Sequence, residues 1–109
     1  MGGVNLDPTL VDSGYSNPSS TTITVPSNMK NAMVIITYTA NNASYRPTTE
    51  SAFDAKVTLP KTADKTVFFT AGHMTHKIYY YKELNSGDQF IAYAYNTTYG
   101  YDYVELIQL

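Results

Sequence analysis

Residues 76–109 read HKIYYYKELNSGDQFIAYAYNTTYGYDYVELIQL and hold most of the chain's eleven tyrosines. Three runs in this stretch, 76–84, 89–95 and 101–108, are rich in Tyr, Ile, Phe and Val, which favour β-strands, and polar turn residues separate them. Gly87 ends the first turn, where a three-residue hairpin loop favours glycine in the left-handed region. The stretch therefore predicts a three-stranded antiparallel meander.

The turn lengths set a register for this meander. A loop of residues 85–87 opposes Tyr79 to Tyr93, and the next loop opposes Tyr93 to Tyr103. Because side chains alternate between the faces of a strand, the two loops agree on which residues share a face. One face holds Ile78, Tyr80, Leu84, Phe90, Ala92, Ala94, Val104 and Leu106. The other holds Tyr79, Tyr81, Ile91, Tyr93, Tyr95, Tyr101 and Tyr103, with Glu83, Gln89 and Glu105. A loop one residue longer would scatter the tyrosines over both faces.

We predict that the first face is core and that the tyrosine-rich face points outward, because it carries charged residues and tyrosine tolerates a wet edge. Six of its tyrosines are candidate ligand or interface residues: Tyr79, Tyr81, Tyr93, Tyr95, Tyr101 and Tyr103. Cross-strand aromatic pairing explains such a face without a ligand, and so does burial against another subunit. Contact with a sugar or protein partner, or nucleic-acid stacking, are the alternatives.

The rest of the chain also reads as short strands with turns between them. Residues 1–19 carry heavy turn punctuation and predict an N-terminal arm or an edge strand near 9–13. Residues 20–109 predict a single domain. Its further strands are expected at 20–25, at 32–40 as the apolar central strand, and at 57–59 and 66–70 as a hairpin; the polar connection 41–54 has room for one helical turn near 49–53. About eight strands in one domain favour an antiparallel β-sandwich or jelly roll.

Composition restricts the partners. The formal net charge is -2, charged residues make up 15%, and no run of Lys or Arg occurs, which argues against nucleic-acid binding. There is no cysteine, and hence no disulfide framework. The first residues lack the basic and apolar regions of a signal peptide, and no apolar run reaches the length of a membrane span. We therefore expect synthesis in a host cytoplasm without a signal peptide, and no membrane insertion.

Few residues point to catalysis. His73 and His76 are three apart, which places them on opposite faces of a strand, so a shared metal requires a turn between them. Glu83 and Glu105 fall on one face in the predicted register, as a carboxylate pair for glycoside hydrolysis would, although exposed carboxylates on a sheet usually serve solubility. No nucleophile elbow or glycine-rich phosphate loop occurs. The sequence predicts a protein that is not an enzyme, with no catalytic, cofactor-binding or metal-binding residue.

Two stretches resemble known modules. Residues 22–29, TITVPSNM, followed by Met33-Val34-Ile35, resemble the start of β-sandwich modules of tailed-phage tail and receptor-binding proteins. Residues 84–90, LNSGDQF, with residues 100–106, GYDYVEL, are similar to the last strands of jelly-roll carbohydrate-binding modules. Both resemblances imply a β-sandwich that recognises surfaces without catalysis.

Three hypotheses follow. The first is a non-enzymatic structural or recognition module of a phage virion or tail-like assembly, which forms a homo-oligomer or binds other virion proteins and contacts the host through the tyrosine face and the loop 41–54. The second is a monomeric carbohydrate-binding module for a cell-surface polysaccharide. The third is a small hydrolase, which would require a turnover that depends on Glu83.

Overall fold

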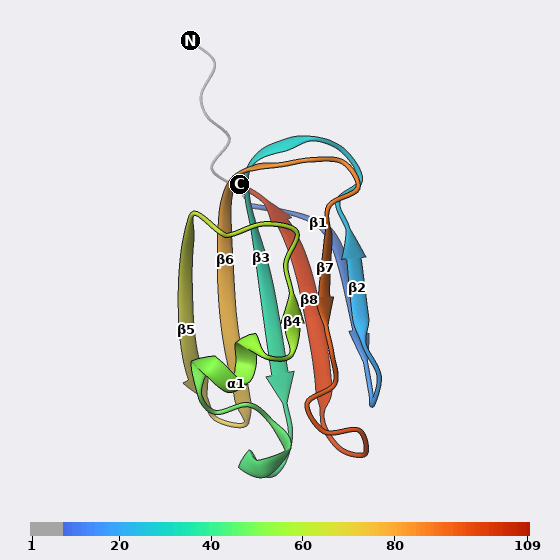
Figure 1. Cartoon of the computed structure of the whole chain (residues 1–109), viewed down its shortest axis with the longest axis vertical. Coiled ribbons are helices and arrows are strands. Elements are labelled where there is room, and N and C mark those ends of the chain that lie inside the picture. The colour runs from blue at the N-terminus through green and yellow to red at the C-terminus, as the bar shows by residue number, and fades with distance from the viewer. Residues whose placement is uncertain (1–7) are drawn as a thin grey trace.

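The computed structural model describes residues 8–109, and in them it shows a sandwich of two antiparallel sheets (Figure 1). The larger sheet has the strand order β1-β8-β3-β6-β5, and the smaller one has the order β2-β7-β4. The prediction of an all-β sandwich with about eight strands is confirmed. The strands are β1 (Thr9–Ser16), β2 (Thr21–Thr24), β3 (Met29–Thr39), β4 (Val57–Thr58), β5 (Lys65–Ala71), β6 (Met74–Leu84), β7 (Gln89–Ala92) and β8 (Tyr101–Gln108).

The strands pair as a nested set. β1 pairs with β8, β2 with β7 and β3 with β6, all antiparallel, which is the nesting of a jelly roll. The innermost pair departs from this order. β5 pairs with β6 in the larger sheet, whereas β4 pairs with β7 in the smaller one. In a complete jelly roll, β4 and β5 would pair with each other. Here they lie in different sheets.

β3 is the predicted central strand, and it lies between β8 and β6 in the middle of the larger sheet (Figure 1). Val34 and Ile36 point into the sandwich and are fully buried. Met33 and Ile35 alternate with them, point to the opposite side of the sheet and are half-buried. An apolar run of this kind is typical of a strand that is covered on both faces.

The predicted C-terminal meander is wrong. β7 crosses to the smaller sheet, and β8 inserts between β1 and β3. The turn at residues 85–88 leads the chain to the smaller sheet because its backbone also bonds Val25, the residue that follows β2. Gly87 N–H donates to the Val25 carbonyl, and Val25 N–H donates to the Asp88 carbonyl, both at 2.8 Å. The expected hairpin of residues 57–59 and 66–70 is also wrong, because its two strands belong to different sheets.

The two faces of β6 are the reverse of those predicted. Tyr79 and Tyr81 are 1% and 0% exposed and lie in the core, so the expected outward tyrosine face is wrong for both. Ile78 and Tyr80, expected in the core, alternate with them on the outside and are half-buried. The inner face also carries one charged residue, Lys77. It forms salt bridges with Glu50 and Asp54 of the helix α1 (Glu50–Asp54), and these carboxylates allow a lysine to be buried here.

Leu84 is nevertheless buried, because the alternation shifts near the end of β6. Tyr81 and Leu84 both point inward. On the facing strand, Met29 and Ala32 do the same, and Asn31 between them has a φ of 54°. The other predicted core residues Phe90, Ala92, Val104 and Leu106 are fully buried, whereas Ala94 is only half-buried.

The segments around this core are tied to it. Residues 9–16 of the expected arm form the edge strand β1, and residues 1–7 lie outside the described residues. The connection 41–54 holds a short 3-10 helix, η1 (Ala43–Tyr45), and α1. Thr49 caps α1 by accepting a hydrogen bond from the Ala52 N–H, as N-cap threonines do. Phe53 of α1 is fully buried.

Candidate functional site on the larger sheet

The face of the larger sheet that points away from the core is mostly apolar. The strand registers place its side chains in four rows that run across the sheet. We call this surface the outer face. Its apolar members are Leu10, Tyr15, Met33, Ile35, Val67, Phe69, Ala71, Met74, Ile78, Tyr80, Tyr101, Tyr103 and Ile107. Its polar members are Ser13, Thr37, Thr39, Lys65, His76 and Glu105.

The edges of the outer face are well exposed. Tyr15 and Leu10 on β1 are 66% and 56% exposed, and Val67 and Phe69 on β5 are 46% and 42% exposed. The central side chains Ile35 and Ile78 are half-buried only because their neighbours in the sheet crowd them. Monomeric proteins rarely expose a contiguous apolar surface larger than a few hundred Å². The outer face is therefore an unusual surface for a protein that stays monomeric.

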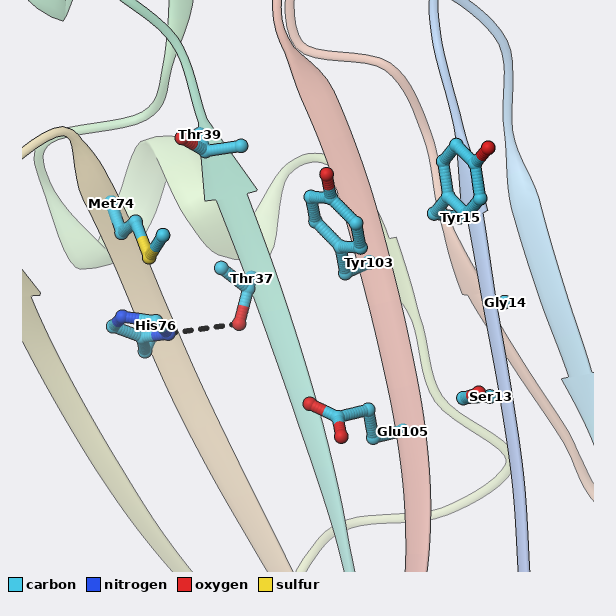
Figure 2. A pocket seen from close by; sticks show the side chains of 9 residues that line it. All are labelled: Ser13, Gly14, Tyr15, Thr37, Thr39, Met74, His76, Tyr103 and Glu105. Carbon is cyan, nitrogen blue, oxygen red and sulfur yellow. Dashed lines mark hydrogen bonds between the residues drawn. The ribbon is translucent and has the colours of Figure 1, made fainter.

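One end of the outer face is hollowed into a pocket of about 630 Å³ (Figure 2). Two aromatic rings form one wall: Tyr15 stacks on Tyr103 with ring centroids 5.6 Å apart. Tyr101, outside the pocket lining, stacks on Tyr103 at 6.3 Å. The pocket lining is Ser13, Gly14, Tyr15, Thr37, Thr39, Met74, His76, Tyr103 and Glu105. The volume lies in the range of small-molecule sites.

Polar groups form the opposite wall of the pocket. The His76 Nδ1 atom shares a hydrogen bond of 2.8 Å with the Thr37 hydroxyl, drawn as a dashed line in Figure 2. Phe69 stacks on the His76 ring at 4.8 Å. Burial lowers the pKa of His76, and the nearby Glu105 carboxylate acts in the opposite direction. The imidazole is therefore held chiefly as a neutral hydrogen-bonding group.

The six candidate tyrosines separate into three places. Tyr101 and Tyr103 lie on the outer face, and Tyr79 and Tyr81 lie in the core. The remaining two, Tyr93 and Tyr95, lie in the segment that follows β7. Tyr93 is 43% exposed and its carbonyl accepts a 2.6 Å hydrogen bond from the Tyr38 hydroxyl, whereas Tyr95 packs against the core. They do not form one surface.

The sequence reasoning missed the outer-face residues of β1 and β5. Tyr15, Phe69 and Met74 are not among the candidates, because the sequence predicts an arm or an edge strand near residues 9–13 and a local hairpin that includes residues 66–70. One signal was available: Met33 and Ile35 alternate with buried residues in the central strand, and an apolar residue on both faces indicates that both faces are covered. That signal could have drawn attention to an apolar outer face.

The groups considered for catalysis do not converge. His73 lies in the turn between β5 and β6, and His76 lies on the outer face. Glu105 is on the outer face beside Ile35, whereas Glu83 faces Lys30 near the far end of β6. Among residues 8–109, no three His, Asp or Glu side chains are placed to hold a metal ion.

The connection 41–54 is fastened to the body of the domain. The Arg46 guanidinium donates hydrogen bonds to the carbonyls of Met74 and Gly72 and to the Thr75 hydroxyl, at 3.0 to 3.2 Å. Tyr45 also packs against Tyr99 with ring centroids 4.9 Å apart. The loop therefore has a fixed shape next to the turn between β5 and β6.

Comparison with known proteins adds no relative: no family model, curated protein or solved structure matches the chain. Within residues 8–109, no helix is long and apolar enough to cross a membrane. Function must therefore be argued from the surfaces described above.

Proposed function

We propose that this protein is a non-enzymatic structural module that assembles with a second copy of itself through the outer face, as a component of a virion or tail-like assembly. The observation that carries the proposal is the apolar outer face. The virion context rests on the resemblance of residues 22–29 and 33–35 to phage tail modules. In this setting the chain leaves the host cytoplasm within the particle.

The size of the outer face fits a contact between subunits. Five strands about 4.8 Å apart make the face about 24 Å wide, and the four rows extend about 20 Å along the strands. The projected area is about 500 Å², and the relief of the side chains makes the accessible area larger. A standard interface takes about 800 Å² from each partner. The area of the outer face is therefore close to the area that one partner contributes to such an interface.

The composition of the outer face favours a second copy of the chain. Its titratable groups other than tyrosine are Lys65, His76 and Glu105, and Lys65 lies at the edge. Large charged regions would oppose contact between identical surfaces, whereas rows of Ile, Met and Tyr can pack against themselves. A two-fold axis that lies between the two faces and parallel to the strands would bring each row against its symmetry mate, as in isologous dimers. Two such sheets would pack about 10 Å apart.

The test is the molar mass in solution, measured by size-exclusion chromatography with light scattering over a range of concentrations. We expect a dimer or a larger symmetric oligomer. The variant Ile78→Lys places a charge at the centre of the outer face and should give a monomer with an unchanged circular dichroism spectrum. Ile91→Lys is the matched control, because Ile91 is also half-buried and points outward, but from the smaller sheet.

Two results would overturn the proposal. The first is a wild-type protein that stays monomeric at every concentration. The second is an Ile78→Lys variant that assembles as the wild type does while its fold is intact.

A second candidate function is a monomeric carbohydrate-binding module, and the stacked tyrosine wall favours it. Tyr15 and Tyr103 offer flat apolar area, and Thr37, His76 and Glu105 supply polar groups to the same pocket. Sugars present both an apolar face and hydroxyl groups, which such a pocket complements. Tyr103→Ala should then weaken polysaccharide binding without changing the molar mass. Loss of the oligomer in the same variant would instead support the first function.

A further inference from the structure

The strand β5 forms one end of the larger sheet, and Figure 1 shows no other described strand on its far side. An unpaired edge strand is a template for another chain, so proteins usually guard it with a bulge, a proline, a charge or a very short strand. Residues 66–71 of β5 have none of these devices. They read TVFFTA, and their register with β6 runs without a bulge. Uncharged segments of β-branched and aromatic residues favour strand pairing.

The other three edge strands of the described sheets are guarded. β1 has an irregular register between Leu10 and Asp12, and the Asp12 carboxylate accepts a hydrogen bond of 2.8 Å from the Ser13 N–H. β2 has four residues and β4 has two, so neither can pair with much of another strand. Among residues 8–109, β5 is therefore the edge that stays open to a further strand.

The backbone of β5 offers donors and acceptors along this open side. A two-residue turn, 72–73, joins β5 to β6, so the flanking residues Ala71 and Met74 form a hydrogen-bonded pair. Such pairs alternate along an antiparallel ladder. The backbone groups that point away from β6 are therefore those of Thr66, Phe68 and Thr70. Outside the β5–β6 pair, no backbone–backbone hydrogen bond among residues 8–109 involves any of these three residues.

A second copy of β5 fits this edge. When two β5 strands run antiparallel about a two-fold axis at Phe68, all seven residues of each strand overlap and the two open sides face each other. Phe68 then opposes the Phe68 of the second copy, and Thr66 opposes its Thr70. These pairs supply about six backbone hydrogen bonds. We infer that β5 pairs in this way with the β5 of a second copy and joins two larger sheets into one continuous sheet.

The side chains of β5 also suit this self-pairing. Val67 and Phe69, which are 46% and 42% exposed, would lie opposite each other across the junction, and β-branched and aromatic residues make favourable cross-strand pairs. Lys65 would lie opposite the Ala71 of the second copy. The two lysines would then be about 20 Å apart along the strands, so no like charges meet. The charge pattern of the strand therefore favours a second copy in this register.

The edge contact is separate from the contact through the outer face, and the inference does not rest on the proposed function. The edge contact is about 24 Å long and one strand wide, which is far smaller than the area of about 800 Å² that each partner gives to a standard interface. In dilute solution the edge contact alone should therefore leave Ile78→Lys chains monomeric. It would link chains or outer-face dimers at high concentration, as in a particle.

Disulfide cross-linking tests the pairing and its register, because the chain has no cysteine of its own. Val67→Cys chains are mixed with an equal amount of Phe69→Cys chains at high concentration under mild oxidation, and mass spectrometry counts the dimers of each kind. In the inferred register, position 67 faces position 69 of the second copy with Cα atoms about 4.5 Å apart, within reach of a disulfide. Positions 67 and 67 would be about 8 Å apart, too far for one.

We expect mixed dimers to be the main product of this reaction. Random collisions would instead give as many dimers of like chains as mixed ones, and that result would overturn the inference. Contact through the outer face cannot imitate the expected result, because sheets that pack face to face lie about 10 Å apart. The same preference should appear in Ile78→Lys chains. A preference that disappears there would overturn the edge pairing as a separate contact, whereas failure of the outer-face dimer alone would leave it unchanged.

A proline variant tests whether the backbone makes the contact. Thr66→Pro removes an N–H that points to the open side, and proline is tolerated in that position of an edge strand. With this change in both chains, the preference for mixed dimers should be lost while the circular dichroism spectrum stays that of the wild type. Thr66→Ala is the matched control, because it removes the same side chain and keeps the N–H. Equal preference in the folded proline and alanine variants would refute pairing through the β5 backbone.

Discussion

The burial of Tyr81 gives the sharpest test of the strand register. Its side chain is 0% exposed, its ring packs edge-on against Phe90 at 5.4 Å, and its hydroxyl donates to the Lys61 carbonyl. Truncating a buried aromatic side chain to alanine costs about 3 to 5 kcal/mol. The loss of the Tyr81 hydrogen bond keeps the total cost within this range or slightly above it. We expect Tyr81→Ala to lower the free energy of unfolding by about 4 kcal/mol.

Tyr93→Ala is the matched control. Tyr93 is 43% exposed, and its hydrogen bond with Tyr38 uses the backbone carbonyl, which the substitution leaves in place. Its cost should be about 1 kcal/mol or less. The local meander register would place Tyr81 and Tyr93 on one outward face, so both substitutions would then cost little.

Urea unfolding followed by circular dichroism measures both values. All variants are compared at one protein concentration, because the unfolding of an oligomer depends on concentration. With a change of about 4 to 8 °C in Tm for each kcal/mol, Tyr81→Ala should also unfold at least 15 °C lower than the wild type. A cost for Tyr81→Ala equal to or below that for Tyr93→Ala would refute the register described here.

Three further predictions concern single groups. Asp54→Ala leaves the Lys77 ammonium poorly compensated and should cost about 1 to 3 kcal/mol in urea unfolding, whereas Lys77→Met should be close to neutral. Burial raises the pKa of Asp102, against the hydrogen bond from Thr21, so the folded state holds this proton more tightly than the unfolded chain does. Ionisation of Asp102 then lowers the free energy of unfolding as the pH rises from about 4 through the folded pKa. Asp102→Asn lacks this ionisation and should become more stable relative to the wild type over the same pH interval. Urea unfolding at several pH values measures this difference. Gly100→Ala should lower Tm more than Gly87→Ala: both glycines have a positive φ, near 90°, but only at Gly100 would a Cβ lie 3.0 Å from a backbone oxygen, whereas at Gly87 it meets nothing.

The sequence identifies where the strands are because alternation and turn residues are local signals. The apolar run in β3 correctly predicts the central strand, and residues Leu84, Phe90, Ala92, Val104 and Leu106 are correctly predicted as core. Strand partners are not local: β1 and β8 join residues from opposite ends of the chain, such as Thr9 and Gln108. A short turn such as 85–88 favours a hairpin by itself, but two of its backbone groups also bond to Val25, which is distant in sequence.

The direction of a strand face is equally hard to predict when one face mixes tyrosine with charge. Tyr79 and Tyr81 share their face with Lys77, and only α1, from a different part of the chain, supplies the carboxylates that make this face an interior one. Glu83 suggested an exposed face, but it lies beyond the shift in alternation near Asn31. The extent of the outer face depends on where β5 pairs, which no local pattern in residues 65–71 reveals.

The position of β8 between β1 and β3 has a consequence for synthesis. A ribosome makes β8 after β1 to β7, yet β8 is one of the two neighbours of the central strand β3 and pairs with β1 along its length. During translation, β1 therefore has no strand to pair with until β8 is made, whereas β3 and β6 can already pair. The larger sheet is completed only after residues 101–108 leave the exit tunnel. Sheets dominated by such distant pairings fold in milliseconds to seconds. Until then, the free edges of β1 and β3 are the part of the nascent chain most in need of protection from aggregation.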